Sequence, residues 1–395
     1  MNILLVSVLR KWPRPDPVGE ALLIASYRSG RWGRFDGFGL VERFERDFAR
    51  YHSAEYGLGV VNATLGLLMA YMALDTEFGD LLVSPAYTFI ATVSAGVVIG
   101  LKPVFVDIDF ETLTMDTNDL ANVLEKDRDN KIRLIVPVHF AGNPAEMDTI
   151  LKLARRHGAY VVEDAAQAQG SVYRGRRVGA LGDIGVFSFQ SSKLMTAGEG
   201  GIAITNNKDL YEKMWSIMHA GRDPGGKWYE HVRIGLNLRM LEFQAAVLLP
   251  QLWNLDETLR RIRENTKIIY EELGGLEQLH IHTTPSHIQT NHYFIPISIE
   301  EKFLDRLSKE KIVSKMREKG YSLVEGYNTP LNKQIAFSEK RWKLPYEEYI
   351  KQNLPNTEKA IRTTMWIPHP ELLESEDYVT RYARTLKNIV RELLA

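Results

Sequence analysis

The stretch 159–206 constrains the fold more than any other part of this chain. It contains three apolar runs with the length and composition of buried strands, namely 160–162, 184–189 and 202–204. The acidic pair Glu163-Asp164 follows the first run directly, and Lys193 follows the second within a few residues. A carboxylate and an amine are therefore expected to leave buried strands close together, next to the glycines of 198–201. This arrangement suits a charged aromatic cofactor.

Apolar runs and amphipathic segments alternate from Gly57 onward, which is the pattern of an α/β sheet. Seven strands are predicted, over 57–61, 81–83, 103–106, 132–138, 159–162, 184–189 and 201–204. Five helices are predicted between and after them, over 64–75, 88–99, 117–126, 145–157 and 208–219. Polar residues follow most of the strand runs: Asn62, Ser84, Asp107, His139 and Asp164. Because ligands of open α/β sheets bind outside the carboxyl ends of the strands, we expect a site along one sheet edge.

The remaining segments suggest a large domain over 1–254 and a small α+β domain over 255–395. Helices are expected over 17–30, 41–51, 257–273, 301–318 and 376–394, and strands over 280–282 and 293–297. Pro250 should kink or end the helix that contains it. The loop 31–39, rich in glycine and aromatic residues, suits a ligand site or a plain surface connection equally well.

Composition narrows the class of protein. The chain of 395 residues has 49 basic and 50 acidic side chains, so its charge gives no reason to expect nucleic acid or a membrane surface as a partner. It has no cysteine, which excludes disulfides and thiol chemistry, and we expect no metal site. The apolar start 1–8 is short and followed by Arg10 and Lys11, unlike a signal peptide, and no run is long enough to span a membrane. We expect a soluble, cytoplasmic protein.

Several motifs of the central stretch agree in order, spacing and identity with one known family. They are Asp164-Ala165-Ala166-Gln167-Ala168, Gly182-Asp183, Phe187-Ser188-Phe189, Lys193 and Gly198-Glu199-Gly200-Gly201. Together they resemble the signature of the DegT/DnrJ/EryC1/StrS aminotransferases, which are fold-type I pyridoxal phosphate (PLP) enzymes that aminate keto sugars and keto cyclitols. The resemblance runs along most of the chain. It implies a large domain with a mostly parallel seven-stranded sheet between helices, and a small C-terminal α+β domain.

The resemblance also implies roles for individual residues. Lys193 would hold PLP as a Schiff base and, once free, move a proton between the substrate carbon and the cofactor. Asp164 would bind the protonated ring nitrogen, and Gln167 would lie beside the phenolic oxygen. Phe89 belongs to the segment 85–92, which resembles the family's P-x-x-T-F-x-A-T, and would stack on the pyridine ring.

The cofactor phosphate would be bound by Ala63, Thr64 and Ser188, with Gln190 a less certain member. Ala63 stands where the family usually has glycine, so a positive φ there would strain the backbone. The segment 235–240 resembles the family's G-x-N-x-R-M, and there the asparagine reaches the phosphate of a neighbouring subunit. Asn237, and less securely Arg239, therefore imply a homodimer with shared active sites. His139 is expected to pack or to form hydrogen bonds rather than to catalyse.

The activity implied is amino transfer from glutamate or glutamine to a keto sugar, nucleotide-linked, free or phosphorylated, or to a keto cyclitol. Residues 189–198 look closest to the aminohydroxybenzoate-synthase and scyllo-inosose aminotransferase branch, so aminohydroxybenzoate formation is an alternative. Sugar dehydratases of this superfamily carry histidine where the aminotransferases carry the lysine. Because this chain has Lys193, dehydration is disfavoured. A PLP-binding regulator without turnover stays open. A nicotinamide dehydrogenase would need a third glycine after Gly57-Leu58-Gly59, which is missing.

Weaker family matches occur in the second domain, at 326–330, 354–358 and 367–370. Each is interpreted as a loop that either faces substrate or serves packing.

Overall fold

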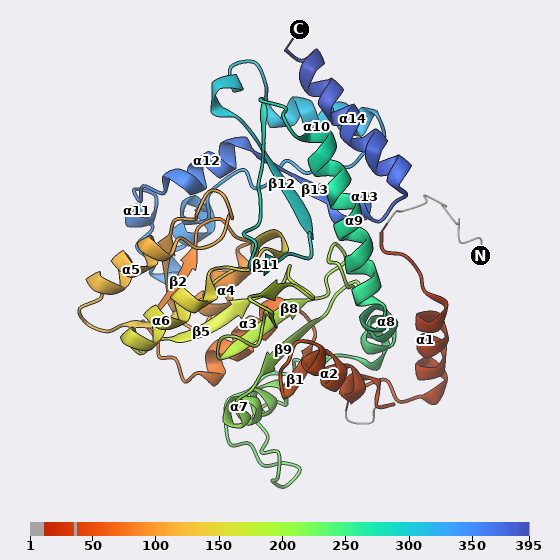
Figure 1. Cartoon of the computed structure of the whole chain (residues 1–395). Helices are drawn as coiled ribbons and strands as arrows, with labels where there is room; N and C mark the ends of the chain where they lie inside the picture. Colours follow the sequence, from red (N-terminus) through yellow and green to blue (C-terminus); the bar gives the residue numbers. More distant parts are fainter. Residues whose placement is uncertain (1–11, 35–37, 395) are drawn as a thin grey trace.

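The computed structural model describes residues 12–34 and 38–394 (Figure 1). The apolar start 1–8 and residues 35–37 of the aromatic loop lie outside the described residues. The central sheet has seven strands in the order β1-β9-β8-β5-β4-β2-β3. They are β1 (Tyr56–Val60), β2 (Leu81–Pro85), β3 (Lys102–Val106), β4 (Ile132–Ile135), β5 (Tyr160–Asp164), β8 (Ile184–Ser188) and β9 (Gly201–Thr205). Only β9 runs antiparallel to its neighbours, so all seven predicted strands and the mostly parallel sheet are confirmed.

Helices cover both faces of this sheet (Figure 1). On one face lie α3 (Ala63–Ala73), α4 (Ala91–Val97) and α7 (Lys208–Met218), which share one apolar core. On the other lie α2 (Leu40–Tyr51), α5 (Thr117–Lys126), α6 (Met147–His157) and α8 (Glu242–Trp253). The helix α1 (Pro17–Ser29) packs against α8. Burial on both faces explains why the strands read as continuous apolar runs rather than as alternating ones.

The rest of the chain forms a smaller α+β layer above the sheet (Figure 1). Its antiparallel sheet consists of β10 (Leu279–Ile281), β12 (Phe294–Ile299) and β13 (Thr364–Pro368). Its helices are α9 (Leu255–Leu273), α10 (Lys309–Glu318), α11 (Tyr346–Tyr349), α12 (Pro355–Thr363), α13 (His369–Leu372) and α14 (Glu376–Glu392). Single 3₁₀ turns lie at Phe140–Gly142, Glu301–Phe303, Leu331–Lys333, Ile335–Ser338 and Lys340–Trp342.

A domain boundary at Leu255 stays a prediction. Within the described residues, none of the helices has the length and apolar character needed to cross a bilayer.

Two segments from distant parts of the chain build a third small sheet. The strands β6 (Val172–Tyr173) and β7 (Arg176–Arg177) form a hairpin, and β11 (Ile288–Gln289) pairs with β6. None of these two-residue strands was predicted, because such a short pairing leaves no periodic signal in the sequence.

Three predictions for helices and loops were wrong. The segment 367–370 is not a loop: Ile367 and Pro368 end β13, which forms because Thr364–Pro368 pair with β12. The segment 354–358 begins α12, with Pro355 at its first turn, where the missing N–H costs nothing. The helix predicted over 301–318 is interrupted, because Ser308 caps a new helix, α10. Pro250 lies inside α8, which continues to Trp253, so it does not end the helix, and a kink there stays a prediction.

Asp107 joins the smaller layer to the central sheet. It follows β3 and is buried, and its carboxylate accepts hydrogen bonds from the backbone N–H groups of Asn356 (2.9 Å) and Thr357 (2.7 Å). The Thr357 hydroxyl donates to it as well, at 2.7 Å. These N–H groups belong to the first turn of α12, so the carboxylate caps that helix and complements its dipole.

Replacing Asp107 with alanine is expected to loosen α12 before the rest of the fold. Three hydrogen bonds to one ionised group are lost, so amide exchange in 355–363 should accelerate by about 10- to 100-fold. Hydrogen exchange with mass spectrometry measures this directly. Asp109→Ala, which removes an exposed carboxylate bound to the Thr112 N–H, should leave the α12 peptide unchanged. Equal exchange in the two variants would contradict the role of Asp107.

Candidate active site

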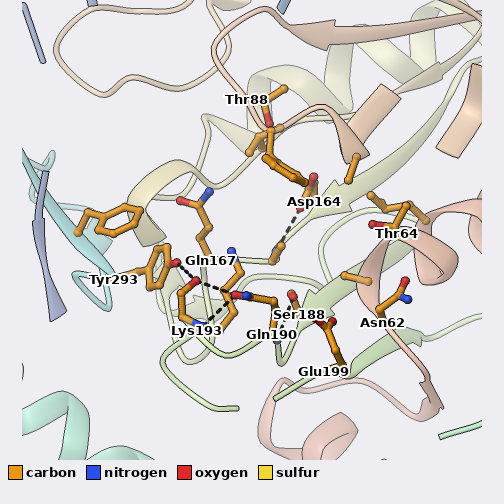
Figure 2. Close-up of a pocket in the computed structure, with 18 of the residues that line it drawn as sticks. Asn62, Thr64, Thr88, Asp164, Gln167, Ser188, Gln190, Lys193, Glu199 and Tyr293 are labelled. Carbon is orange, nitrogen blue, oxygen red and sulfur yellow. Dashed lines mark hydrogen bonds between the residues drawn. The ribbon is translucent and has the colours of Figure 1, made fainter. Parts of the chain in front are cut away.

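One cavity of about 660 Å³ opens at the carboxyl edge of the central sheet (Figure 2). It is lined by residues at the ends of β5 and β8 and in the loops and helices that follow β1, β2, β5 and β8: Asn62, Ala63, Thr64, Leu67, Thr88, Phe89, Ala91, Asp164, Ala166, Gln167, Ser188, Gln190, Ser192 and Lys193. Val138, Glu199 and four aromatic residues from the smaller layer, Tyr293, Phe294, Tyr327 and Trp366, complete the wall. The sheet edge expected from the sequence therefore carries a cavity, and the predicted site residues meet there, except Asn237 and the less securely predicted Arg239.

The N-terminus of α3 forms one end of the cavity. Asn62 caps this helix by accepting a hydrogen bond from the Leu65 N–H at 2.9 Å. Ala63 is the first helical residue and is not among the described residues with positive φ, so the strain considered for it is absent. Gly201 passes so close to this turn that a Cβ would lie 2.7 Å from the Ala63 nitrogen. The turn presents free N–H groups and the hydroxyls of Thr64 and Ser188, a combination that binds phosphate.

Asp164 is the last residue of β5 and lies at the floor of the cavity. It is buried and accepts hydrogen bonds from the Thr92 hydroxyl (2.7 Å) and the Ala166 N–H (3.2 Å). Burial raises the pKa of its carboxyl, while these hydrogen bonds and the positive charge of Lys193 act in the opposite direction. A buried carboxylate with only two donors is stabilised further by a cationic N–H in the cavity.

Glu163, the neighbour of Asp164 on β5, is fully paired within the protein. Its carboxylate accepts backbone N–H groups of Gly179, Leu181 and Gly182, each at 2.7 Å, and the ring of His139 at 2.9 Å. His139 accepts from the Ala145 N–H through its other ring nitrogen, so it donates to Glu163. Burial alone would raise the pKa of Glu163, but His139 and the backbone donors lower it below the usual glutamate range.

Lys193 lies at the opposite end of the cavity from α3 (Figure 2). Its Nζ atom is 4.8 Å from the centre of the Tyr293 ring. Its carbonyl accepts a hydrogen bond from the indole of Trp12 at 3.1 Å, and its N–H donates to the Gln190 carbonyl at 2.8 Å. The amine therefore points into the cavity on a backbone that is held from two sides.

Two further predicted residues lie between these ends. Phe89 follows β2 on a turn before α4, and 62% of its surface is exposed, so it is a cavity wall and not a core residue. The Gln167 side-chain oxygen accepts the Ala141 N–H at 2.7 Å, and its NH₂ group, which carries two N–H donors, faces the Tyr327 hydroxyl as well as the cavity.

Asn237 is the predicted site residue that does not line the cavity of its own chain. It is exposed and pairs with His219 in an isolated bridge, and Arg239 pairs with Val60 in another. The segment before it presents large exposed apolar side chains, including Trp228, Tyr229 and Ile234 at 75%, 76% and 86% exposure.

Several residues at the site were not singled out from the sequence. Thr92 was part of a quoted motif, but only the structure shows that it bonds Asp164 and, at 2.9 Å, Thr88. Tyr327 stands in a predicted substrate-facing loop, which was the available signal for it. Trp12, Tyr293 and Trp366 carry no local pattern that distinguishes them from core aromatic residues.

Comparison with known proteins places the chain in a family. Residues 22–384 match the model of the DegT/DnrJ/EryC1/StrS aminotransferase family. A pleiotropic regulatory protein of Geobacillus stearothermophilus is 33% identical over 95% of this chain and 96% of its own. The L-glutamine:2-deoxy-scyllo-inosose aminotransferase of Streptoalloteichus tenebrarius is 31% identical over 96% and 94%. The crystal structure of 3-amino-5-hydroxybenzoic acid synthase superposes with a TM-score of 0.88 at 30% identity, over 96% and 98% of the two chains.

The fold and the cavity thus define an aminotransferase. The chain belongs to the DegT/DnrJ/EryC1/StrS aminotransferase family, and its relatives include the scyllo-inosose aminotransferase named above and a GDP-perosamine synthase of Escherichia coli O157:H7, 38% identical over 61% of this chain and 65% of its own.

The pairing of Glu163 predicts a specific acid sensitivity. Because its folded pKa lies below the free value of 4.5, its stabilisation is complete above that pH and is lost as the pH falls toward the folded pKa. Glu163→Gln should lower stability at pH 7 by about 2–4 kcal/mol, and it should flatten the fall in thermal midpoint below about pH 5. Scanning calorimetry from pH 7 to 3 measures both. The exposed Glu125→Gln is the control, and a Glu163→Gln profile parallel to that of the wild type would refute this assignment.

Proposed function

We propose that this aminotransferase uses PLP, held by Lys193, to move an amino group from glutamate or glutamine to a keto cyclitol or keto sugar. The observation that carries the proposal is the joint position of an amine, a buried carboxylate and a helix N-terminus around one cavity. These are the three groups that a charged, phosphorylated pyridine aldehyde requires. Bound PLP would supply an electron sink for the negative charge that develops at the substrate carbon.

The chain's own residues fit that cofactor. The free N–H groups before Leu65, with Thr64, Ala63 and Ser188, would hold the phosphate. Asp164 would accept a hydrogen bond from the ring nitrogen and keep it protonated, and this cationic partner would offset the burial that raises the pKa of the carboxyl.

Phe89 and Gln167 would orient the ring. The exposed face of Phe89 offers a flat contact for the pyridine, and the NH₂ group of Gln167, which also contacts Tyr327, offers an N–H donor for the phenolic oxygen.

Lys193 would have two duties. Its Nζ atom would hold the cofactor covalently and, once a donor amino acid displaces it, would carry a proton to and from the substrate carbon. The hydrogen bonds to its carbonyl and N–H keep the Nζ atom within reach for both duties. The aromatic residues Tyr293, Phe294, Tyr327 and Trp366 would cover the ring of the acceptor.

A second copy of the chain would complete each site. Asn237 is exposed and absent from its own cavity, and the neighbouring segment exposes Trp228, Tyr229 and Ile234. Exposed apolar side chains gathered on one segment favour an interface. Asn237 would then reach the phosphate end of the neighbour's cavity, with Arg239 behind it.

The visible spectrum tests the cofactor and the donor. Wild-type protein with PLP should show the absorbance of a lysine-bound cofactor, and glutamate or glutamine should convert it to that of the aminated cofactor. Lys193→Ala should lack the first band, and Asp164→Asn should slow the conversion by about 100-fold or more, since a neutral amide no longer stabilises the ring N–H cation. A panel of keto cyclitols, free keto sugars and nucleotide-linked keto sugars then identifies the acceptor.

Each alternative has its own outcome in this experiment. Binding of PLP without any conversion by donors would indicate a regulator. An aromatic product would indicate aminohydroxybenzoate formation, and a deoxygenated product without nitrogen would indicate dehydration. Absence of the lysine-bound band would overturn the proposal.

Mixed dimers test the shared site. Lys193→Ala and Asn237→Ala protomers, co-expressed with different tags, should regain about one quarter of the wild-type conversion rate, because about half of the dimers are mixed and each has one intact site. Each variant alone should be at least about 10-fold slower than this mixture. A mixture no faster than the average of the two parents would show that Asn237 acts within its own chain or not at all.

A further inference from the structure

Tyr293 lies directly under the amine of Lys193. It precedes β12 in the smaller layer, only 3% of its surface is exposed, and the Lys193 Nζ atom lies 4.8 Å from its ring centre. Its hydroxyl is 2.9 Å from the Ser192 hydroxyl, so the ring is tied to the residue next to the lysine (Figure 2). A cation within about 6 Å of a ring centre is attracted to the negative face of the ring.

The ring of Tyr293 is fixed in this orientation from behind. His369 stacks on it with ring centres 5.6 Å apart and planes 29° apart. Trp12 meets His369 edge-on at 4.8 Å, and the same indole donates to the Lys193 carbonyl. Trp12, His369 and Tyr293 thus form an aromatic stack that contacts Lys193 at both its carbonyl and its amine.

His369 does not compete with Lys193 for the ring of Tyr293. Burial lowers the pKa of His369 to about 3, and the nearby charge of Lys193 acts in the same direction. The imidazole is therefore neutral at pH 7 and does not compete with the ammonium for the ring. The described residues that line the cavity include one cation, Lys193.

We propose that the ammonium group of Lys193, when it is not bound to the cofactor, rests over the ring of Tyr293. The inference rests on the proposed function, in which Lys193 is released from the cofactor whenever an amino acid takes its place. At that stage the amine needs a position close enough to return and to exchange a proton. The ring of Tyr293 stabilises the protonated amine there without forming a hydrogen bond that would have to be broken.

The proposal is tested by substitutions that change the π electron density of the aromatic ring at position 293. Tyr293→Phe keeps the ring and removes the hydroxyl, and phenylalanines with one, two or three fluorine atoms at position 293 keep the shape while they weaken the negative face. The readout is the rate at which an acylating reagent labels Lys193 in the cofactor-free protein at a fixed pH, quantified by peptide mass spectrometry. Only the neutral amine reacts, so the rate should rise stepwise with fluorination, by about 2- to 5-fold in total.

The matched control is the same series at Phe294. This ring also lines the cavity and adjoins the Tyr293 ring, with ring centres 4.1 Å apart, but the Lys193 Nζ atom lies over Tyr293, and Phe294 stacks on Trp366 at 4.8 Å. Its fluorination should leave the labelling of Lys193 unchanged. A labelling rate at position 293 that does not depend on fluorination, or an equal trend at position 294, would overturn the proposal.

Failure of this inference can be separated from failure of the proposed function, because the labelling uses protein without cofactor. If the visible spectrum shows no lysine-bound PLP, the proposed function fails while the labelling trend stands or falls independently. If the spectrum is as expected and the trend is absent, only the role of Tyr293 is lost.

Discussion

The burial of two adjacent carboxylates at the end of β5 is the constraint on which the site depends. Successive residues of a strand point to opposite faces of the sheet, so Glu163 and Asp164 enter different environments. Glu163 receives four donors from His139 and the 179–182 turn, whereas Asp164 receives two and faces the cavity. One carboxylate therefore holds the loop in place, and the other is left with the capacity to bind a cation.

The cavity exists because the smaller layer closes over the sheet edge. Asp107 attaches α12 to the end of β3, and the Trp366 indole donates to the Tyr87 hydroxyl at 3.3 Å. These contacts bring Tyr293, Phe294, Tyr327 and Trp366 opposite the strand ends. The floor of the resulting cavity is polar and consists of a helix N-terminus and strand ends, and its wall is aromatic. Such a cavity can bind a flat charged ring on one side and a polyhydroxylated ring on the other.

Sequence reasoning was accurate for the buried strands of the central sheet. All seven sheet strands were predicted, because each is an apolar run buried on both faces. It was wrong for β13, which forms by pairing with a distant strand, β12, and it missed two local signals, Pro355 in the first turn of α12 and the Ser308 cap of α10. The roles assigned to Lys193, Asp164 and Asn237 stay predictions. The structure adds that Lys193 and Asp164 share a cavity which Asn237 of the same chain does not reach.

The amino-acid sequence by itself determined the α/β class, the family resemblance and the residue types at the strand ends. These depend on periodicity and on motifs within a few dozen residues. Only the tertiary structure decided what surrounds Lys193. Trp12 is 181 residues from it in sequence, and the contact between Ser192 and Tyr293 spans 101 residues. Such contacts arise from the packing of whole layers, so no local pattern in the chain encodes them.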